Sequence, residues 1–225
     1  GEVEITADWF NIEVDDRIAL TSNAAPTDAQ RAAMGAAGIP NPELIGEVNY
    51  FTNDFNTDTS GLDIVATYGT DLWGGSTEFS AAYNYTDTEV SDQGNVTSDS
   101  KVKRLEEGLP NHRATFTMDQ NWENVSAFVR ANYFGEYYAV HADWFGTDAD
   151  SAMTFDMEVT YSLNDNFDVS IGGQNIFDQD AERIEGSSGA VGEGVPGNVL
   201  GAIFYETSPM GIEGAFWYVK AGYNF

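Results

Sequence analysis

The sequence of 225 residues has no cysteine and little positive charge. Without cysteine the chain can form neither a disulfide framework nor a thiolate metal site. Lys and Arg together number 9 against 37 Asp and Glu, which gives a formal net charge of -28. Because contacts to nucleic-acid phosphates need clustered Lys and Arg, this balance excludes nucleic acid as a partner.

Long apolar runs are also missing from the sequence. A membrane helix needs about 18 to 20 consecutive apolar residues, and no window of the chain approaches that length. Aromatic residues are nonetheless abundant, with 14 Phe, 11 Tyr and 5 Trp. This composition fits both a soluble β-sandwich and an outer-membrane β-barrel, because the alternation within a barrel strand hides its apolar residues in the average.

Apolar and polar residues alternate in eight segments, a period that is typical of half-buried β-strands. The last segment, 214–225, is the clearest, since its polar face carries Lys220 and its apolar face carries Ala215, Trp217, Val219, Ala221 and Tyr223. The same alternation runs through 3–10, 61–68, 78–85, 113–119, 125–133, 152–163 and 167–174. The sequence therefore predicts an all-β protein of about eight strands.

The connections between these segments differ in length. Short turns are expected at 71–76, 120–124 and 162–166, and long loops at about 19–46, 91–110, 142–151 and 178–200. Outer-membrane barrels have short periplasmic turns and long extracellular loops. Within the first long loop, Thr27 and Gln30 have the spacing of a capping box, so a short helix is expected to start there and to stop at Gly35 and Gly38.

Three features favour lipid, rather than a second sheet, as the neighbour of the apolar face. Aromatic residues recur near its strand ends, as the membrane-interface girdles of a barrel require: Trp9, Tyr68, Tyr133, Tyr161 and Tyr223. Charge is nearly absent from this face. The stretch 45–70 is expected to form one strand of about 25 residues, far beyond the ~5 to 6 of soluble sheets. We therefore predict a transmembrane antiparallel β-barrel.

Several stretches resemble the last third of a TonB-dependent receptor, a 22-stranded outer-membrane transporter with a plugged lumen. They are NDFNTDTSGLDIVATY (53–68), LPNHRATF (109–116), QNIFDQD (174–180) and the ending YETSPMGIEGAFWYVKAGYNF. The resemblance implies that residues 1–225 are the C-terminal part of the barrel domain, about the last eight of its 22 strands, with the plug domain absent. A closed eight-stranded barrel is the alternative, with a structural or adhesive role and acidic loops that bind a partner or calcium.

The same resemblance implies a function and a location. The chain is expected in the bacterial outer membrane, as part of an importer for energy-coupled uptake of a scarce nutrient such as a siderophore, sugar or peptide. Its implied partners are outer-membrane lipid and lipopolysaccharide, TonB through the missing N-terminal plug, and an unknown small-molecule ligand. A last strand that ends on an aromatic residue resembles the signal read by the insertion machinery, which implies an assembly role for Trp217, Tyr223 and Phe225.

Ligand contacts are expected on the extracellular rim, where aromatic stacking and cation–π contacts suit sugars, siderophores and peptides. The candidates are Tyr137, Tyr138, His141, Trp144, Phe145 and Arg183. The alternative interpretation places them in the outer aromatic girdle or in loop packing. No cofactor or metal site is expected: GEGVPG (192–197) has no preceding strand or following helix, and TDADSAM (147–153) has Ala152 and Met153 where a calcium loop needs an acidic residue and a glycine.

Only two histidines are available for acid–base chemistry. A turn near residues 121–122 would place His112 opposite Ala131, and His141 would then lie ten residues further on, about 33 Å away at ~3.3 Å per residue. We therefore expect no shared catalytic centre and predict that the protein is not an enzyme. His112 is expected to be a hydrogen-bonding residue of the barrel wall or rim, although one histidine acting with an Asp or Ser stays open as a hydrolase site.

Overall fold

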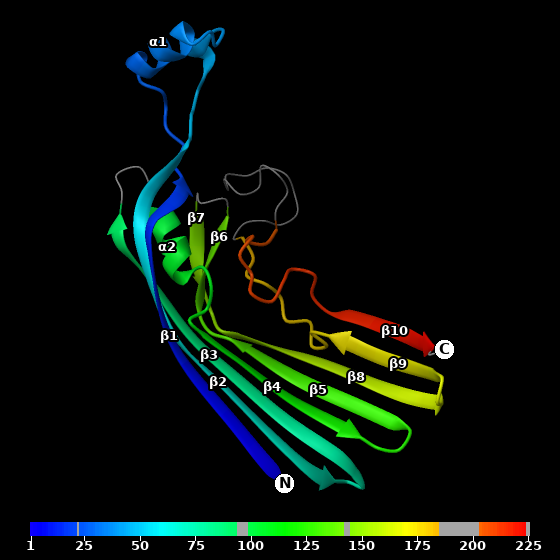
Figure 1. Ribbon diagram of the computed structural model, residues 1–225. Helices are drawn as coiled ribbons and strands as arrows, with labels where there is room; N and C mark the ends of the chain where they lie inside the picture. Colours follow the sequence, from blue (N-terminus) through cyan, green and yellow to red (C-terminus); the bar gives the residue numbers. More distant parts are fainter. Residues whose placement is uncertain (22, 94–98, 142–144, 185–202, 224–225) are drawn as a thin grey trace.

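A curved antiparallel sheet of eight strands dominates the computed structural model, which describes residues 1–21, 23–93, 99–141, 145–184 and 203–223 (Figure 1). The strands follow the chain order across the sheet: β1 (Glu2–Leu20), β2 (Phe51–Leu72), β3 (Gly75–Gln93), β4 (His112–Asn121), β5 (Val125–Phe134), β8 (Ala152–Asn164), β9 (Phe167–Gln174) and β10 (Phe216–Tyr223). The predicted all-β fold of about eight barrel strands is confirmed.

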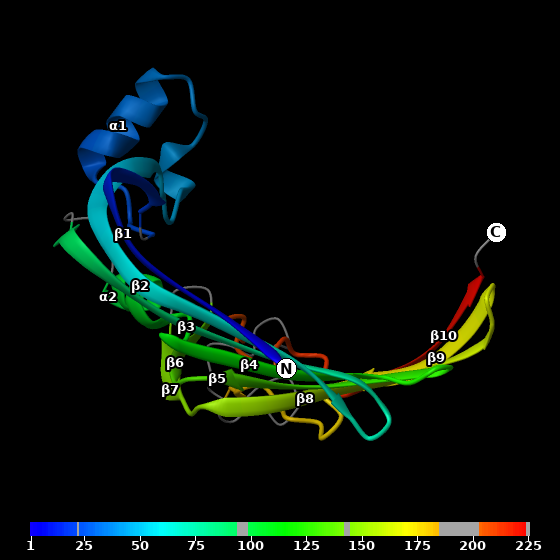
Figure 2. The same cartoon turned by 60° about the horizontal axis from the view of Figure 1, so that its bottom comes forward.

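The sheet is an open arc (Figure 2). Over the described residues, β1 pairs with β2 alone and β10 pairs with β9 alone, so the two strands form the opposite edges of the sheet. The alternative of a closed eight-stranded barrel is therefore wrong, because it requires a hydrogen-bond ladder between the first and last strands.

Short turns join the strands at one end of the sheet, as expected. Trp73 and Gly74 connect β2 to β3 with φ angles of 50° and 75°, the pair of positive φ values that a type I′ hairpin turn needs. The turn between β4 and β5 is closed by the Trp122 amide, which donates to the Val125 carbonyl at 2.8 Å.

This second turn lies two residues later than the sequence suggested, and the register of β4 against β5 therefore shifts by four residues. Phe116, not His112, lies opposite Ala131. His112 instead lies beside Gly135, whose amide donates to the His112 carbonyl at 2.8 Å. His141 is thus six residues beyond the neighbour of His112, rather than ten.

The long connections carry the other elements: α1 (Asp28–Ala36), the 3₁₀ helix η1 (Pro42–Leu44), α2 (Asp99–Glu107), and a separate hairpin of β6 (Tyr137–His141) and β7 (Phe145–Ala149). The capping box of α1 is confirmed, since Thr27 Oγ1 accepts from the Gln30 amide and Gln30 Oε1 accepts from the Thr27 amide. The helix runs through Gly35 and the chain turns at Gly38, which has a φ of 87°. No helix in the described part of the chain is long and apolar enough to cross a membrane.

The strand expected over 45–70 starts later, at Phe51. The preceding residues are held by α1 and η1 instead: Arg31 Nη1 donates to the carbonyls of Pro42 and Ile45 at 2.8 and 2.7 Å. The strand nevertheless runs for 22 residues, so its length still exceeds that of ordinary soluble strands.

One face of the sheet is apolar and is not covered by protein. Residues opposite one another across the strands share a face, and one such row consists of Ile5, Ala66, Ala81, Phe116, Ala131 and Phe155. On this face Ile5 is 66% exposed, Trp9 73% and Val219 71%. Such a large apolar surface cannot face water stably, and the described residues provide no second sheet against it. The β-sandwich interpretation is thereby excluded.

Candidate functional site

The opposite face of the sheet carries a network of polar side chains that bond from strand to strand. Asn84 of β3 donates to Asp63 of β2 at 2.7 Å, and Thr160 of β8 pairs with Ser170 of β9 at 2.8 Å. Arg130 of β5 donates to Thr117 of β4 at 3.3 Å. In an open barrel wall of this kind, such a face borders water or a polar filling rather than lipid.

A glycine lets this network cross a whole strand. Gly172 of β9 lies between Glu158 of β8 and Tyr218 of β10. The Tyr218 hydroxyl donates to Glu158 Oε2 at 2.6 Å, and Lys220 Nζ contacts the same oxygen at 2.5 Å. A Cβ atom on Gly172 would lie 2.6 Å from the Tyr218 hydroxyl oxygen, so the contact needs glycine there.

The polar face also contains a pocket of about 540 Å³, which we call the lumen pocket. Its wall comes from β5, β8 and β9, and the segment 209–214 covers it. Asn132 donates to Thr154 Oγ1 at 3.2 Å and to Asp156 Oδ2 at 3.0 Å, while the Asn175 amide donates to Asp156 Oδ1 at 2.9 Å. The carboxylate of Asp156 is therefore held in one orientation.

The chemistry of the lumen pocket suits a polar ligand that is neutral or cationic. Asp156 and Glu213 contribute carboxylates, while Met210, Phe134 and Phe216 contribute apolar surface. No Lys or Arg belongs to the described lining. Carboxylates and amides accept hydrogen bonds from hydroxyl and amine groups, whereas they repel anions. As a whole, this pocket could not be predicted from the sequence, because its residues come from β5, β8, β9 and β10 and from the distant segment 209–214.

The expected ligand residues Tyr137, Tyr138 and His141 lie in β6 and are buried, with exposed fractions of 5%, 9% and 6%. They belong to or adjoin a small apolar cluster, here called the loop core, of Tyr137, Ala139, Ala149, Ile184 and Tyr205. Burial raises the pKa of the Tyr137 phenol, so this group is neutral at physiological pH. These positions favour the alternative interpretation, in which they pack loops together.

Hydrogen bonds tie the hairpin to the segment 203–207. The Val140 amide donates to Thr207 Oγ1 at 2.9 Å, and the Thr207 hydroxyl donates to the Tyr138 carbonyl at 3.3 Å. His141 Nδ1 also lies within ion-pair distance of Glu206 Oε1, at 3.2 Å. Arg183, another expected ligand residue, is exposed, pairs with Asp180 at 2.9 Å and lies over the Phe204 ring at 5.1 Å. Of the two remaining candidates, Phe145 pairs with His141 in the hairpin ladder, and Trp144 lies outside the described residues.

Lys103 links α2 to the hairpin. Its Nζ lies 2.7 Å from Asp148 of β7, 3.6 Å from Glu107 and 4.3 Å from the centre of the Tyr138 ring. The hydrogen bond to Asp148 raises the pKa of Lys103 above its ordinary value of 10.5. One side chain thus links the β6–β7 hairpin to a helix from a different loop.

We expect the substitution Lys103→Met to loosen this hairpin while keeping most of the apolar stem. An exposed ion pair is worth roughly 0.2–1 kcal/mol and an exposed cation–π contact roughly 0.5–1 kcal/mol, so the amides of β6 should exchange about 3- to 30-fold faster. Hydrogen exchange of the whole protein measures this. Lys101→Met is the matched control, because Lys101 donates to the Leu20 carbonyl instead.

The pH dependence follows from the raised pKa of Lys103. A raised lysine pKa means that folding favours the charged form, so the contribution is complete below pH 10.5 and is lost only as the pH rises through the higher folded-state pKa. Protection of β6 by Lys103 should therefore not change between about pH 7 and 9. Equal exchange in the Lys103→Met and Lys101→Met variants would contradict the proposed link.

The residues with an implied assembly role lie mostly on the apolar face of the edge strand β10. Trp217 and Tyr223 are 58% and 59% exposed there, while Phe225 lies outside the described residues.

His112 also lies on the apolar face, at the end of the sheet away from the short turns, where its Nδ1 bonds to the Tyr83 hydroxyl at 2.8 Å. His112 is thus hydrogen bonded on the strand wall, as expected.

Neither the calcium-loop-like stretch 147–153 nor the glycine motif GEGVPG forms a described ligand site. The stretch 147–153 forms the end of β7 and the start of β8 rather than one loop, and GEGVPG lies outside the described residues. Within the described ranges, no group of three or more His, Asp or Glu side chains is placed to hold a metal ion.

The fold is similar to that of solved outer-membrane proteins, at low sequence identity. The copper transporter OprC matches with a TM-score of 0.61 and 18% identity, over 100% of this chain and 29% of that one. The outer-membrane transporter YddB from Escherichia coli gives 0.60 and 10%, over 100% and 31%, and the FrpB iron transporter from Neisseria meningitidis gives 0.59 and 12%, over 100% and 29%. The chain thus spans under a third of the length of these structures.

A family model relates the sequence itself to these proteins. The model described as TonB dependent receptor-like, beta-barrel matches residues 1–176. A comparison with curated proteins gave no match. With an open sheet that has one apolar and one polar face, the chain belongs to the TonB-dependent receptor β-barrel family, whose members are β-barrels of the Gram-negative outer membrane.

Proposed function

We propose that this chain forms the C-terminal part of the barrel of an energy-coupled importer, about the last eight of 22 strands. The plug domain and the segment that contacts TonB would then come from outside these 225 residues. The observation that carries this proposal is the division of the sheet: its apolar face is exposed as a lipid-facing wall is, and its polar face is bonded from strand to strand and hollowed by the lumen pocket.

The proposed role is transport rather than catalysis. The lumen pocket presents fixed hydrogen-bond acceptors and apolar surface, which together suit binding of a small polar solute. The proposed ligand is a scarce nutrient such as a siderophore, sugar or peptide that carries hydroxyl or amine groups. Anionic ligands are disfavoured, because Asp156 and Glu213 line the pocket and the chain as a whole is strongly acidic.

Asp156→Ala in the full-length receptor is expected to weaken ligand capture. Hydrogen bonds to a charged group contribute roughly 1.5–3 kcal/mol, so the half-saturating ligand concentration should rise about 10- to 100-fold. Uptake by the host of a radiolabelled siderophore, oligosaccharide and peptide identifies the substrate and measures this change. Asp168→Ala is the matched control, because Asp168 of β9 lies on the same polar face of the sheet as Asp156 of β8 but outside the pocket.

Deleting TonB tests the energy coupling separately. Uptake should fall to the level of cells that lack the receptor, while surface binding of the labelled nutrient persists. Uptake that continues without TonB would contradict the proposed importer. Equal effects of the Asp156 and Asp168 variants would contradict the role of the lumen pocket alone.

A further inference from the structure

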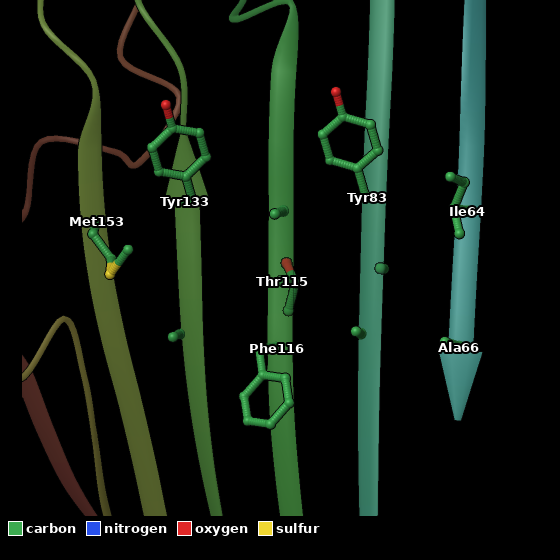
Figure 3. Close-up of a pocket in the computed structure, with 11 residues that line it drawn as sticks. Ile64, Ala66, Tyr83, Thr115, Phe116, Tyr133 and Met153 are labelled. Carbon is green, nitrogen blue, oxygen red and sulfur yellow. The ribbon is translucent and has the colours of Figure 1, made fainter. Parts of the chain in front are cut away.

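The sheet is hollowed on both of its faces at β5 and β8. On the apolar face, a hollow of about 310 Å³ is lined by strand residues alone, among them Tyr133 and Met153 (Figure 3). Their neighbours in the chain, Asn132 and Thr154, line the lumen pocket on the opposite face. The lumen pocket differs because the segment 209–214, here called the pocket cover, also belongs to its lining. Whatever holds the pocket cover in place therefore decides the shape of the pocket.

The pocket cover is anchored just beyond its two ends. Before it, Thr207 is bonded to β6. After it, the Ala215 amide donates to Asp178 Oδ1 at 2.8 Å. Over the described part of the chain, residues 209–214 themselves make hydrogen bonds only with Ser208. The pocket cover is thus a span that is fixed at its ends and not by bonds to the pocket wall.

Asp178 belongs to a tight turn that follows β9, residues 175–179, here called the latch turn. Asn175 Nδ2 donates to the Gln179 carbonyl and the Gln179 amide donates to Asn175 Oδ1, each at 2.9 Å. The Asp178 amide donates to the Asn175 carbonyl at 2.8 Å. Asn175 and Asp178 have φ angles of 47° and 57°, which Asn and Asp adopt more readily than most residues. The sequence NIFDQ therefore suits this turn.

The latch turn is bonded to both the wall and the cover of the lumen pocket. On the wall side, the Asn175 amide donates to Asp156 Oδ1 at 2.9 Å. On the cover side, a Cβ atom on Gly214 would lie only 2.6 Å from Asp178 Oδ1, and the φ of Gly214 is 67°. Glycine is therefore needed there for the close approach. One turn thus joins the carboxylate of the wall to the end of the cover that carries Glu213.

We propose that Asp178 is a positioning residue of the lumen pocket. It holds the pocket cover, and with it Glu213 and Met210, over the wall, and so sets how tightly the pocket retains a solute. Asp178 does not belong to the lining, so its effect on a solute passes through the cover. The effect on solute retention rests on the proposed function of the pocket, whereas the fixing of the cover does not.

Hydrogen exchange of the full-length receptor tests whether Asp178 fixes the cover. Asp178→Gly removes the carboxylate and keeps the positive φ, because glycine adopts it freely. The Ala215 amide should then exchange about 10-fold faster, as expected for the loss of one exposed hydrogen bond to a charged group. Asp178→Asn keeps an acceptor oxygen and should restore most of the protection. Asp180→Gly is the matched control, because Asp180 pairs with Arg183 instead.

Retention of a solute tests the second step. The probe is whichever of a radiolabelled siderophore, oligosaccharide or peptide the wild-type receptor binds. A cover that opens about 10-fold more often releases the solute up to about 10-fold faster, so the half-life of the bound probe should shorten in Asp178→Gly and stay unchanged in Asp180→Gly.

Three results would overturn the proposal: unchanged exchange of the Ala215 amide in Asp178→Gly, an equal effect of Asp180→Gly or Asp178→Asn, or a loosened cover with an unchanged half-life of the bound probe. A wild-type receptor that binds none of the three probes would contradict the proposed function instead. In that case, the exchange measurement still decides whether Asp178 fixes the cover.

Discussion

The substitution Val129→Arg is expected to destabilise the assembled receptor strongly and to lower its amount in the outer membrane. Val129 lies on the apolar face at the middle of β5, four residues from Val125 and four from Tyr133, and is 40% exposed. An Arg at the midplane of a barrel's lipid face costs roughly 2–4 kcal/mol. The ratio of folded to unfolded barrel should therefore fall roughly 30- to 700-fold, which unfolding titrations in liposomes and the amount in the outer membrane both measure.

Phe128→Arg is the matched control, one residue away at nearly the same depth. Phe128 lies on the polar face and pairs with Asp119 of β4 and Glu158 of β8. An Arg there meets two carboxylates and water or a polar filling, and Arg130 already occupies this face. We therefore expect near-normal assembly of Phe128→Arg. Equal loss in the two variants would mean that the apolar face does not contact lipid.

The barrel wall could be predicted from the sequence because it depends on a local pattern, the alternation of apolar and polar residues along each strand. Alternation along 125–133 and 152–163 places Val129 and Val159 on one face, and the register of β5 against β8 confirms that such residues stay together. Turn position was less well determined. The sequence NWEN allows a turn at two places, and only the bond from the Trp122 amide to Val125 selects Glu123 and Asn124.

The candidate site was predicted less well, because it depends on contacts between distant segments. Tyr137, Tyr138 and His141 have the side chains of a ligand site, yet all three are buried, and Tyr137 packs with Ile184 and Tyr205 from distant segments in the loop core. Nothing near residue 137 in the sequence indicates these neighbours. Loop packing was the alternative interpretation of these residues, and their burial favours it.

The lumen pocket could be predicted in part, because the direction of its wall residues follows from local alternation. Asn132 and Asp156 each occupy a polar-face position of a predicted strand, so their direction could be derived from alternation alone. Their meeting depends on the register of β5 against β8, and Glu213 arrives from a segment more than fifty residues away. The alternation on neighbouring strands therefore predicts the wall of the pocket, but it does not predict that the segment 209–214 covers it.

Residues 1–225 alone are expected not to form a closed, monomeric barrel in detergent micelles or liposomes. The edge strand β1 is 19 residues long, and the opposite edge strand, β10, has 8 residues. Each backbone group without a hydrogen-bond partner costs several kcal/mol in lipid, and a spanning strand of about 9–11 residues presents roughly five residues' groups on its free side. Two such edges cost more than the ~5–15 kcal/mol that stabilises a typical domain.

Exposed edges of this length also pair with other chains, so the isolated chain should aggregate or form mixed oligomers while the full-length receptor gives a heat-modifiable monomer. Gel mobility before and after heating, together with size-exclusion chromatography, separates these outcomes. A heat-modifiable monomer of the 225 residues would require a ladder between β1 and β10, where the structure has each paired on one side only. That result would support the closed eight-stranded barrel instead, in which the chain crosses the membrane without further strands.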